Sequence, residues 1–180
     1  TGALSFSGMF AFLTAGSFVY VELHAVSVEH VGYLFGLNVI SMMIMTVVNG
    51  RLVRLKGSQW MLTLGLAIQL LAACLLLAGQ LLDLGLWGVV IPVMLYTSCI
   101  STVGSNSMGI LLSDYPQIAG TASSLAGTLR FGLGGVAAAI IAFLPATSSW
   151  PMVSVIFFCA CLAIVCLQQR NVKHRRLLSQ

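Results

Sequence analysis

Six long apolar runs, separated by short polar stretches, make up nearly the whole chain. They cover residues 3–23, 32–49, 59–81, 86–112, 119–144 and 151–167. A helix of about 20 apolar residues crosses the roughly 30 Å hydrocarbon core of a bilayer, and each run is close to that length. Apolar residues make up 59% of the sequence and charged residues only 7%, whereas a soluble domain is about 25% charged. We therefore predict an all-α membrane protein with six transmembrane helices and the lipid bilayer as a partner.

Basic residues lie almost entirely in the polar stretches. Seven of the eight Lys and Arg residues fall within residues 51–56 and 170–176. Cytoplasmic loops are enriched in Lys and Arg, and six spans put both ends of the chain on the same side as these two clusters. We expect both ends to be cytoplasmic, with residues 169–180 as a basic tail, and we interpret the clusters as orientation signals and not as a nucleic-acid surface. Because the chain starts at Thr1 without a Met, we expect it to be part of a longer protein.

Arg130 is the exception, since it lies inside the fifth apolar run. It stands about 11 residues, or roughly 16 Å, from the start of that run, near the middle of a bilayer. A cation at this depth costs between about 2.5 and 17 kcal/mol unless it faces protein or water. Ser123, Gly127, Arg130 and Gly134 share one helical face, and small residues let a neighbouring helix approach. We expect Arg130 to point into the bundle, where it binds a substrate group or an acidic residue, or fixes helices through their backbone carbonyls.

Three other runs carry polar, methionine or aromatic residues on one face. The fourth run has two adjoining polar stripes, Ser98, Ser101 and Ser105 beside Cys99, Thr102 and Asn106. One face of the second run carries Asn38, Met42, Met45 and Asn49. The first run has an aromatic stripe of Phe6, Phe10, Ser17 and Tyr20. Unsatisfied polar groups are costly in lipid, so the polar residues either line a water-filled path or bond to their own helix. Met42, Phe10 and Tyr20 line the same path or are packing residues. The candidate substrate-binding residues are Arg130, Asn106, Ser101, Asn38, Met42, Phe10 and Tyr20.

The third run is the most uniformly aliphatic, and we expect it to face lipid. The five cysteines all lie in apolar runs, without a C-x-x-C motif or a nearby His, which is typical of packing residues. Ser123 and Ser124 have no His or Lys at helical spacing to activate them as nucleophiles. We predict that the chain is not an enzyme and that it has neither a metal site nor a bound cofactor.

Several segments resemble one transporter family. Residues 119–135, AGTASSLAGTLRFGLGG, resemble the eleventh-helix signature of the bicyclomycin-resistance (Bcr/CflA) drug exporters, which are members of the major facilitator superfamily. Residues 8–22, 32–38, 105–108 and 150–152 are also similar to that family. Residues 50–57 resemble a degenerate copy of the superfamily loop G-x-L-x-D-R-x-G, with Arg54 in place of the Asp.

The resemblance implies that the chain forms helices seven to twelve of a twelve-helix transporter of the bacterial inner membrane, one six-helix lobe of a major-facilitator fold. It also implies a drug:proton antiporter that works by alternating access and is driven by the proton gradient. The expected partners are small-molecule drugs, protons and a missing N-terminal six-helix lobe that carries the proton-binding carboxylate.

Two other hypotheses make different predictions. A non-transporting membrane scaffold or receptor requires the polar stripes to bind each other and to leave no cavity. A membrane-embedded enzyme requires acid, base or metal ligands clustered at one depth. A half-size carrier that acts as a dimer is a variant of the transporter hypothesis.

Overall fold

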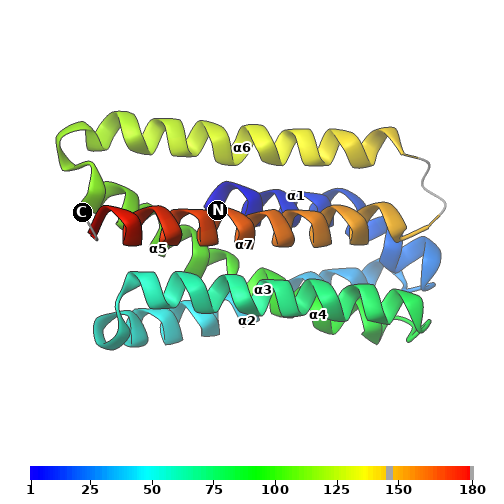
Figure 1. Ribbon diagram of the computed structural model, residues 1–180. Coiled ribbons are helices and arrows are strands. Elements are labelled where there is room, and N and C mark those ends of the chain that lie inside the picture. Colours follow the sequence, from blue (N-terminus) through cyan, green and yellow to red (C-terminus); the bar gives the residue numbers. More distant parts are fainter. Residues whose placement is uncertain (145–147, 179–180) are drawn as a thin grey trace.

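The computed structural model describes the backbone of residues 1–144 and 148–178 and the side chains of residues 1–144 and 148–170. Within these residues the fold is all-helical. The elements are α1 (Gly2–Phe18), a π-helical turn η1 (Val19–Leu23), α2 (Val28–Lys56), α3 (Ser58–Leu81), α4 (Trp87–Ser98), α5 (Ile100–Asp114), a short 3-10 helix η2 (Pro116–Ile118), α6 (Ala119–Phe143) and α7 (Trp150–Leu178). The long helices run side by side with nearly parallel axes (Figure 1).

Six helical segments of the described chain are long and apolar enough to cross a membrane. They are Gly2–Leu23, Val28–Lys56, Ser58–Leu81, Trp87–Asp114, Pro116–Phe143 and Trp150–Arg170. Each corresponds to one predicted run, so the prediction of an all-α, multi-pass membrane protein with six spans is confirmed.

The second span is longer than predicted at both ends. Residues 50–56, predicted to belong to a loop, form the last two turns of α2, and Gly57 alone separates α2 from α3. Leu52 and Val53 continue the helical pattern, and Arg54 and Lys56 in the last turn interact favourably with the negative end of the helix dipole. Gly57 ends the helix at φ 81°, a backbone conformation that glycine adopts without a steric penalty.

The fourth span is broken at Cys99 into α4 and α5. Just before the break, the hydroxyls of Thr97 and Ser98 donate to the carbonyl oxygens of Met94 and Leu95, three residues earlier. The amide of Cys99 likewise donates to the carbonyl of Tyr96 instead of one four residues back. Side-chain donors that compete for helix carbonyls bend helices, which accounts for the break.

The predicted basic tail, residues 169–180, begins as a continuation of α7. The helix runs on through Leu178 instead of ending near residue 167, while residues 179–180 lie outside the described residues. Arg170 donates to the Oε1 atom of Gln59 at 3.1 Å, which joins the end of α7 to the start of α3.

Helices α1 and α3 and the broken helix α4–α5, the most buried span, form the centre of the bundle. Helix α1 packs against α5, α6 and α7, and α3 packs against α4, α5 and α7. In the most apolar 18-residue window of each span, 44% of residues are buried in α3 but only 11% in α2 and 17% in the α6 span. The prediction that the third span faces lipid therefore holds for only one side of the helix: Leu71 and Leu75 are exposed, whereas the opposite side fills the core with Met61, Leu62, Leu66 and Leu76.

Candidate functional site

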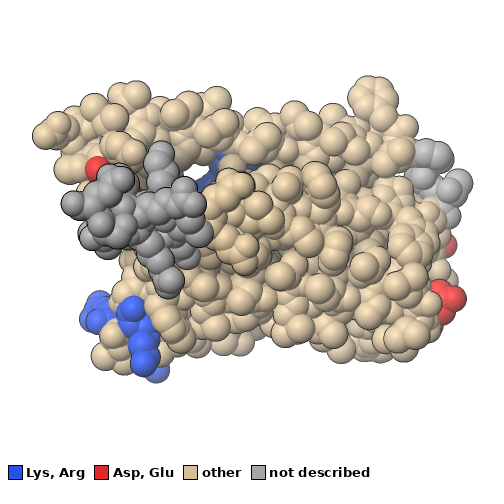
Figure 2. Space-filling view, viewed as in Figure 1, with Lys and Arg blue, Asp and Glu red and all other residues tan. Residues whose placement is uncertain are grey.

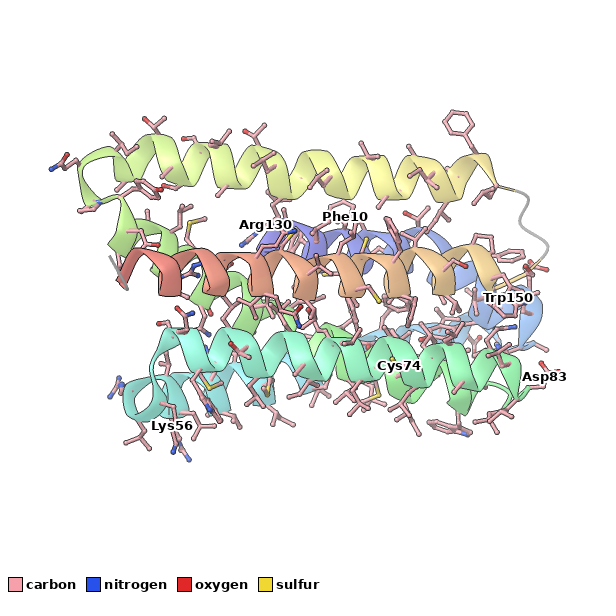
Figure 3. The ribbon with its side chains drawn as sticks, viewed as in Figure 1. Phe10, Lys56, Cys74, Asp83, Arg130 and Trp150 are labelled. Carbon is pink, nitrogen blue, oxygen red and sulfur yellow. The ribbon has the colours of Figure 1, made fainter. Side chains whose placement is uncertain are left out.

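Arg130 points from α6 toward α1 and α5. Its Nη2 atom donates to the carbonyl oxygen of Gly104 at 3.4 Å, and its guanidinium carbon lies 5.2 Å from the centre of the Phe6 ring. A Cβ on Gly104 would lie 3.3 Å from Nη2, so glycine at this position lets the guanidinium rest against the backbone of α5. Figure 3 shows Arg130 between α6 and the helices beneath it.

The guanidinium has few partners in the chain itself. Arginine has five N–H donors, and among the residues that the structure describes only the Gly104 carbonyl accepts a hydrogen bond from Arg130. The sequence has four acidic residues: Glu22, Glu29 and Asp114 lie at the ends of spans, and Asp83 lies between two spans. The side chain lines a pocket of about 230 Å³, together with residues of α1, α5 and α6. Among the described residues no acidic side chain pairs with its charge.

Phe10 belongs to an aromatic cluster beside Arg130. The centres of the Phe6 and Phe10 rings lie 5.6 Å apart, and the Phe131 ring meets both edge-on at 5.6 and 6.4 Å. Such edge-to-face pairs stabilise by about 0.5–1.5 kcal/mol beyond their burial. Gly134 makes room for the cluster, because a Cβ there would lie 2.9 Å from the Phe10 ring. Phe131 was not among the predicted site residues, although its position next to Arg130 in the sequence was a usable signal.

Hydrogen bonds join α2 to the broken helix α4–α5, and we call this contact the α2–α5 polar seam. It includes three of the candidate residues: Asn38 on α2, and Ser101 and Asn106 on α5. Asn106 Nδ2 donates to Asn49 Oδ1 at 2.7 Å, and the Thr97 hydroxyl donates to Asn38 Oδ1 at 2.9 Å. Ser101 and Thr46 hydroxyl oxygens lie 2.6 Å apart. Asn38 and Asn106 are buried and Ser101 is half-buried. Here Asn38, Ser101 and Asn106 bond across the two helices, whereas the buried hydroxyl of Thr102, in the same stripe as Asn106, has no partner among the described residues.

Met42 and Tyr20 occupy different surroundings. Met42 is half-buried on α2, and its carbonyl oxygen accepts a hydrogen bond from Thr46. Tyr20 is fully buried against the rings of Phe12 and Phe35, away from the cluster around Phe10. The π-helical turn that begins at Val19 adds residues to the turn and shifts the register of α1, which explains why Tyr20 leaves the predicted stripe.

A buried polar network that the sequence did not single out joins α1, α3 and α4. Ser5 Oγ donates to Gln69 Oε1 at 2.8 Å, Gln69 Nε2 donates to the Tyr96 carbonyl at 3.2 Å, and the Tyr96 hydroxyl donates to the Ser5 carbonyl at 3.1 Å. A glutamine in an otherwise aliphatic span was the available signal, because a lone amide in lipid lacks partners. Among the described residues no three His, Cys, Asp or Glu side chains lie together in a way that could hold a metal ion.

The charged side chains gather at the two ends of the bundle. Figure 2 shows blue atoms of Lys and Arg at one end, below the grey residues, and red atoms of Asp and Glu mostly at the other. Lys56 and Asp83 mark these opposite ends in Figure 3. The long sides between them are largely uncharged, as expected for a surface that contacts lipid.

Comparison with known proteins identifies relatives of this chain. It is 36% identical over 176 residues to the bicyclomycin resistance protein homolog of Haemophilus influenzae, covering 96% of this chain and 44% of that protein. The chain is a homologue of part of a major-facilitator transporter. It is also 25% identical over 153 residues to an uncharacterized MFS-type transporter of Bacillus subtilis, covering 85% of this chain and 38% of that protein. No family model and no solved structure matches it.

This homology confirms the predicted relationship to the bicyclomycin-resistance transporters. It is a relationship to transporters and not to enzymes. The chain spans less than half the length of the curated relatives it matches. The six spans described above therefore correspond to part of a major-facilitator protein.

Proposed function

We propose that this chain is the C-terminal six-helix lobe of a drug:proton antiporter of the bicyclomycin-resistance type, which works by alternating access in the bacterial inner membrane. The observation that carries the proposal is the 36% identity to a bicyclomycin resistance protein homolog along 96% of this chain. Since the match covers only 44% of that protein, a second lobe of similar size completes the transporter in our proposal.

Glycines on the two most exposed helices support a missing lobe. A Cβ built on Gly32 or Gly36 of α2, or on Gly127 or Gly135 of α6, would meet no atom within 4 Å. Small residues in membrane helices permit close contact with another helix. Their open surroundings within this chain favour a partner that packs on α2 and α6, and we propose that the N-terminal lobe is that partner.

The charge distribution supports the proposed orientation. Arg51, Arg54 and Lys56 end α2 at the same end of the bundle as Arg170 of α7, which bonds to Gln59 at the start of α3. By the positive-inside rule we propose that this end, where α7 ends, is cytoplasmic. Thr1 lies beside Arg130, partway along the bundle (Figure 1).

In the proposed mechanism the candidate residues have two kinds of role. Arg130, with Phe10 beside it, contacts the substrate or an acidic group of the missing lobe, because its charge is not neutralised within the described residues. Asn38, Asn106 and Ser101 hold α2 against α4 and α5, and Met42 adjusts the shape of that wall. Tyr20 supports the end of α1 from its buried position.

A scaffold or receptor is the second candidate, and the α2–α5 polar seam favours it. That hypothesis predicted that the polar stripes bind each other, and the bonds of Asn106 to Asn49 and of Thr97 to Asn38 are of this kind. It gives no role to a guanidinium near mid-membrane that lacks an acidic partner, and for this reason we prefer the transporter.

Drug export by the full-length protein tests the proposal. Cells that lack their own exporters and express the protein should tolerate more bicyclomycin, and adding drug to inverted membrane vesicles should release protons. Arg130→Ala should abolish both effects at unchanged protein level, whereas Leu75→Ala, at an exposed position on α3, should leave both intact. Tolerance and proton release that are unchanged in Arg130→Ala, or absent from the unmodified protein, would refute the proposal.

A further inference from the structure

Helices α6 and α7 are consecutive in the chain but are separated by a groove. Helix α6 packs mainly along α1, α7 packs along α1 and α3, and the two touch each other little. The groove between them has a volume of about 670 Å³ and is lined by Leu133, Val136 and Ile140 of α6 and by Val155 and Phe158 of α7, among other residues. This volume lies within the roughly 300–1,000 Å³ typical of ligand pockets.

The groove adjoins the pocket of Arg130. Leu129 lines the Arg130 pocket and Leu133 lines the groove, one helical turn further along α6. On α1, the neighbouring residues Ala3 and Leu4 line the pocket and the groove, respectively. Figure 2 shows blue atoms inside a hollow beneath α6. The apolar groove between α6 and α7, which we call the α6–α7 groove, therefore lies next to the pocket that Arg130 lines.

The α6–α7 groove is on the side of α6 that bears large aliphatic residues. Leu125, Leu129, Leu133, Val136 and Ile140 are all exposed there. Another face of α6 exposes the small or hydroxyl-bearing residues Gly120, Ser124, Thr128, Gly135 and Ala139, together with the ring of Phe131. Aliphatic side chains suit contact with lipid, whereas small ones suit contact with a helix. We therefore expect a ligand of the α6–α7 groove to come from the bilayer.

Such a ligand has an apolar tail and a negatively charged head. An oxyanion at Arg130 would accept hydrogen bonds from the guanidinium N–H groups that have no acceptor among the described residues. A bidentate, charge-assisted pair is among the strongest hydrogen-bonded arrangements of a guanidinium. A carboxylate is planar and small enough to reach the depth of Arg130, while phospholipid phosphates lie in the headgroup region outside the hydrocarbon core. We propose that the α6–α7 groove binds an amphipathic carboxylate, with its carboxylate at Arg130 and its aliphatic tail between α6 and α7. The carboxylate and the proposed substrate or acidic group of the missing lobe would contact the same guanidinium, so they would compete for Arg130.

Binding measurements on the full-length protein in lipid nanodiscs test the proposal without requiring transport. The probes are dodecanoate, uncharged dodecanol and dodecyl phosphate, each competing with a fluorescent fatty acid. We expect dodecanoate to bind about tenfold or more tightly than dodecanol, as expected for one strong charged pair. Equal affinities for these two probes would overturn the proposal, and tighter binding of dodecyl phosphate would assign the groove to a phosphate-bearing lipid instead.

Variants test the charged end of the site, at Arg130, and its apolar end, between α6 and α7, independently. Arg130→Gln should remove the preference for dodecanoate over dodecanol, and Arg130→Lys should retain part of it. Ala137→Trp, which fills the groove, should weaken the binding of both probes, whereas Met43→Trp on the exposed face of α2 should change neither. A preference that survives Arg130→Gln, or binding that is unaffected by Ala137→Trp, would contradict the proposal. Melting temperatures of each variant show whether a loss of binding reflects misfolding, and Arg130→Lys decides the question if Arg130→Gln misfolds.

Discussion

Asn106 and Asn49 join α5 to α2 through a hydrogen bond of 2.7 Å between the Nδ2 atom of the first and the Oδ1 atom of the second. The second Nδ2 hydrogen of Asn106 is donated to the carbonyl oxygen of Thr102 at 2.8 Å. Asn49 also lies 3.5 Å from the Ser105 hydroxyl, a weaker contact. Two amides deep in a membrane protein thus satisfy each other instead of facing a cavity.

A double-mutant cycle measures this bond. Asn106→Ala and Asn49→Ala should each lower the free energy of unfolding of the full-length protein, and their coupling energy should be about 0.6–1.7 kcal/mol, the range for hydrogen bonds between membrane helices. The measurement is reversible unfolding in mixed micelles. As a control, Asn49→Ala and Ser113→Ala should be additive, because the Ser113 hydroxyl bonds within its own helix. A coupling energy near zero for the Asn pair would show that the bond contributes nothing to stability.

Gly8→Ala should destabilise the protein, because a Cβ on Gly8 would lie 2.1 Å from the Tyr96 hydroxyl oxygen. That hydroxyl must then move and lose its bond to the Ser5 carbonyl. We expect a loss of about 1–3 kcal/mol from overpacking. Gly109→Ala is the matched control: a Cβ there meets nothing within 4 Å, and alanine in a helix is favoured over glycine by about 0.5–1 kcal/mol. Thermal unfolding of both variants should therefore shift in opposite directions, and a shift in the same direction would be evidence against the described contact of Gly8 with Tyr96.

Gly104→Ala should impair export by moving Arg130. The added methyl group would approach Nη2 to 3.3 Å, which pushes the guanidinium away from the carbonyl that now accepts its hydrogen bond. The drug concentration that cells tolerate should fall toward that of cells without the transporter, at unchanged protein level. Gly109→Ala again serves as the control, since it lies in the same helix with open surroundings. Full tolerance in Gly104→Ala cells would mean that the position of Arg130 against α5 is unimportant for export.

Phe10→Leu and Met42→Ala should change which drugs are exported without stopping all transport. Phe10 contributes one of three rings beside Arg130, and methionine is a side chain that adapts its shape to different partners. Susceptibility to a panel of drugs of different size and charge is the measurement, and Leu13→Ala, at an exposed position of α1, is the control. If both variants only reduce the amount of protein in the membrane, the two residues serve packing alone.

Local sequence patterns are sufficient to predict the six spans, but they are insufficient to predict which residues of different spans contact each other. The run at 119–144 became α6 almost residue for residue, since apolar length and helix propensity are properties of the segment itself. Residues 50–56 were misassigned to a loop because charge was taken as the end of the helix, although a membrane helix extends past the lipid without penalty. The sequence does not show that Gln69 is buried, because its partners, Ser5 and Tyr96, are distant in sequence.

The sequence by itself determined that this chain is a six-span membrane protein related to bicyclomycin-resistance transporters. The length of an apolar run and the residues of a family motif are local properties, which can be read from consecutive residues. The tertiary structure alone decided which polar groups meet: that Asn106 bonds to Asn49, that Tyr20 leaves the stripe of Phe10, and that Arg130 lies between Phe6 and Gly104. Those outcomes depend on how each helix is rotated and bent against its neighbours. The rotation of each helix about its axis is set by how its faces pack against several other helices, and a single run of the sequence carries no information about those helices.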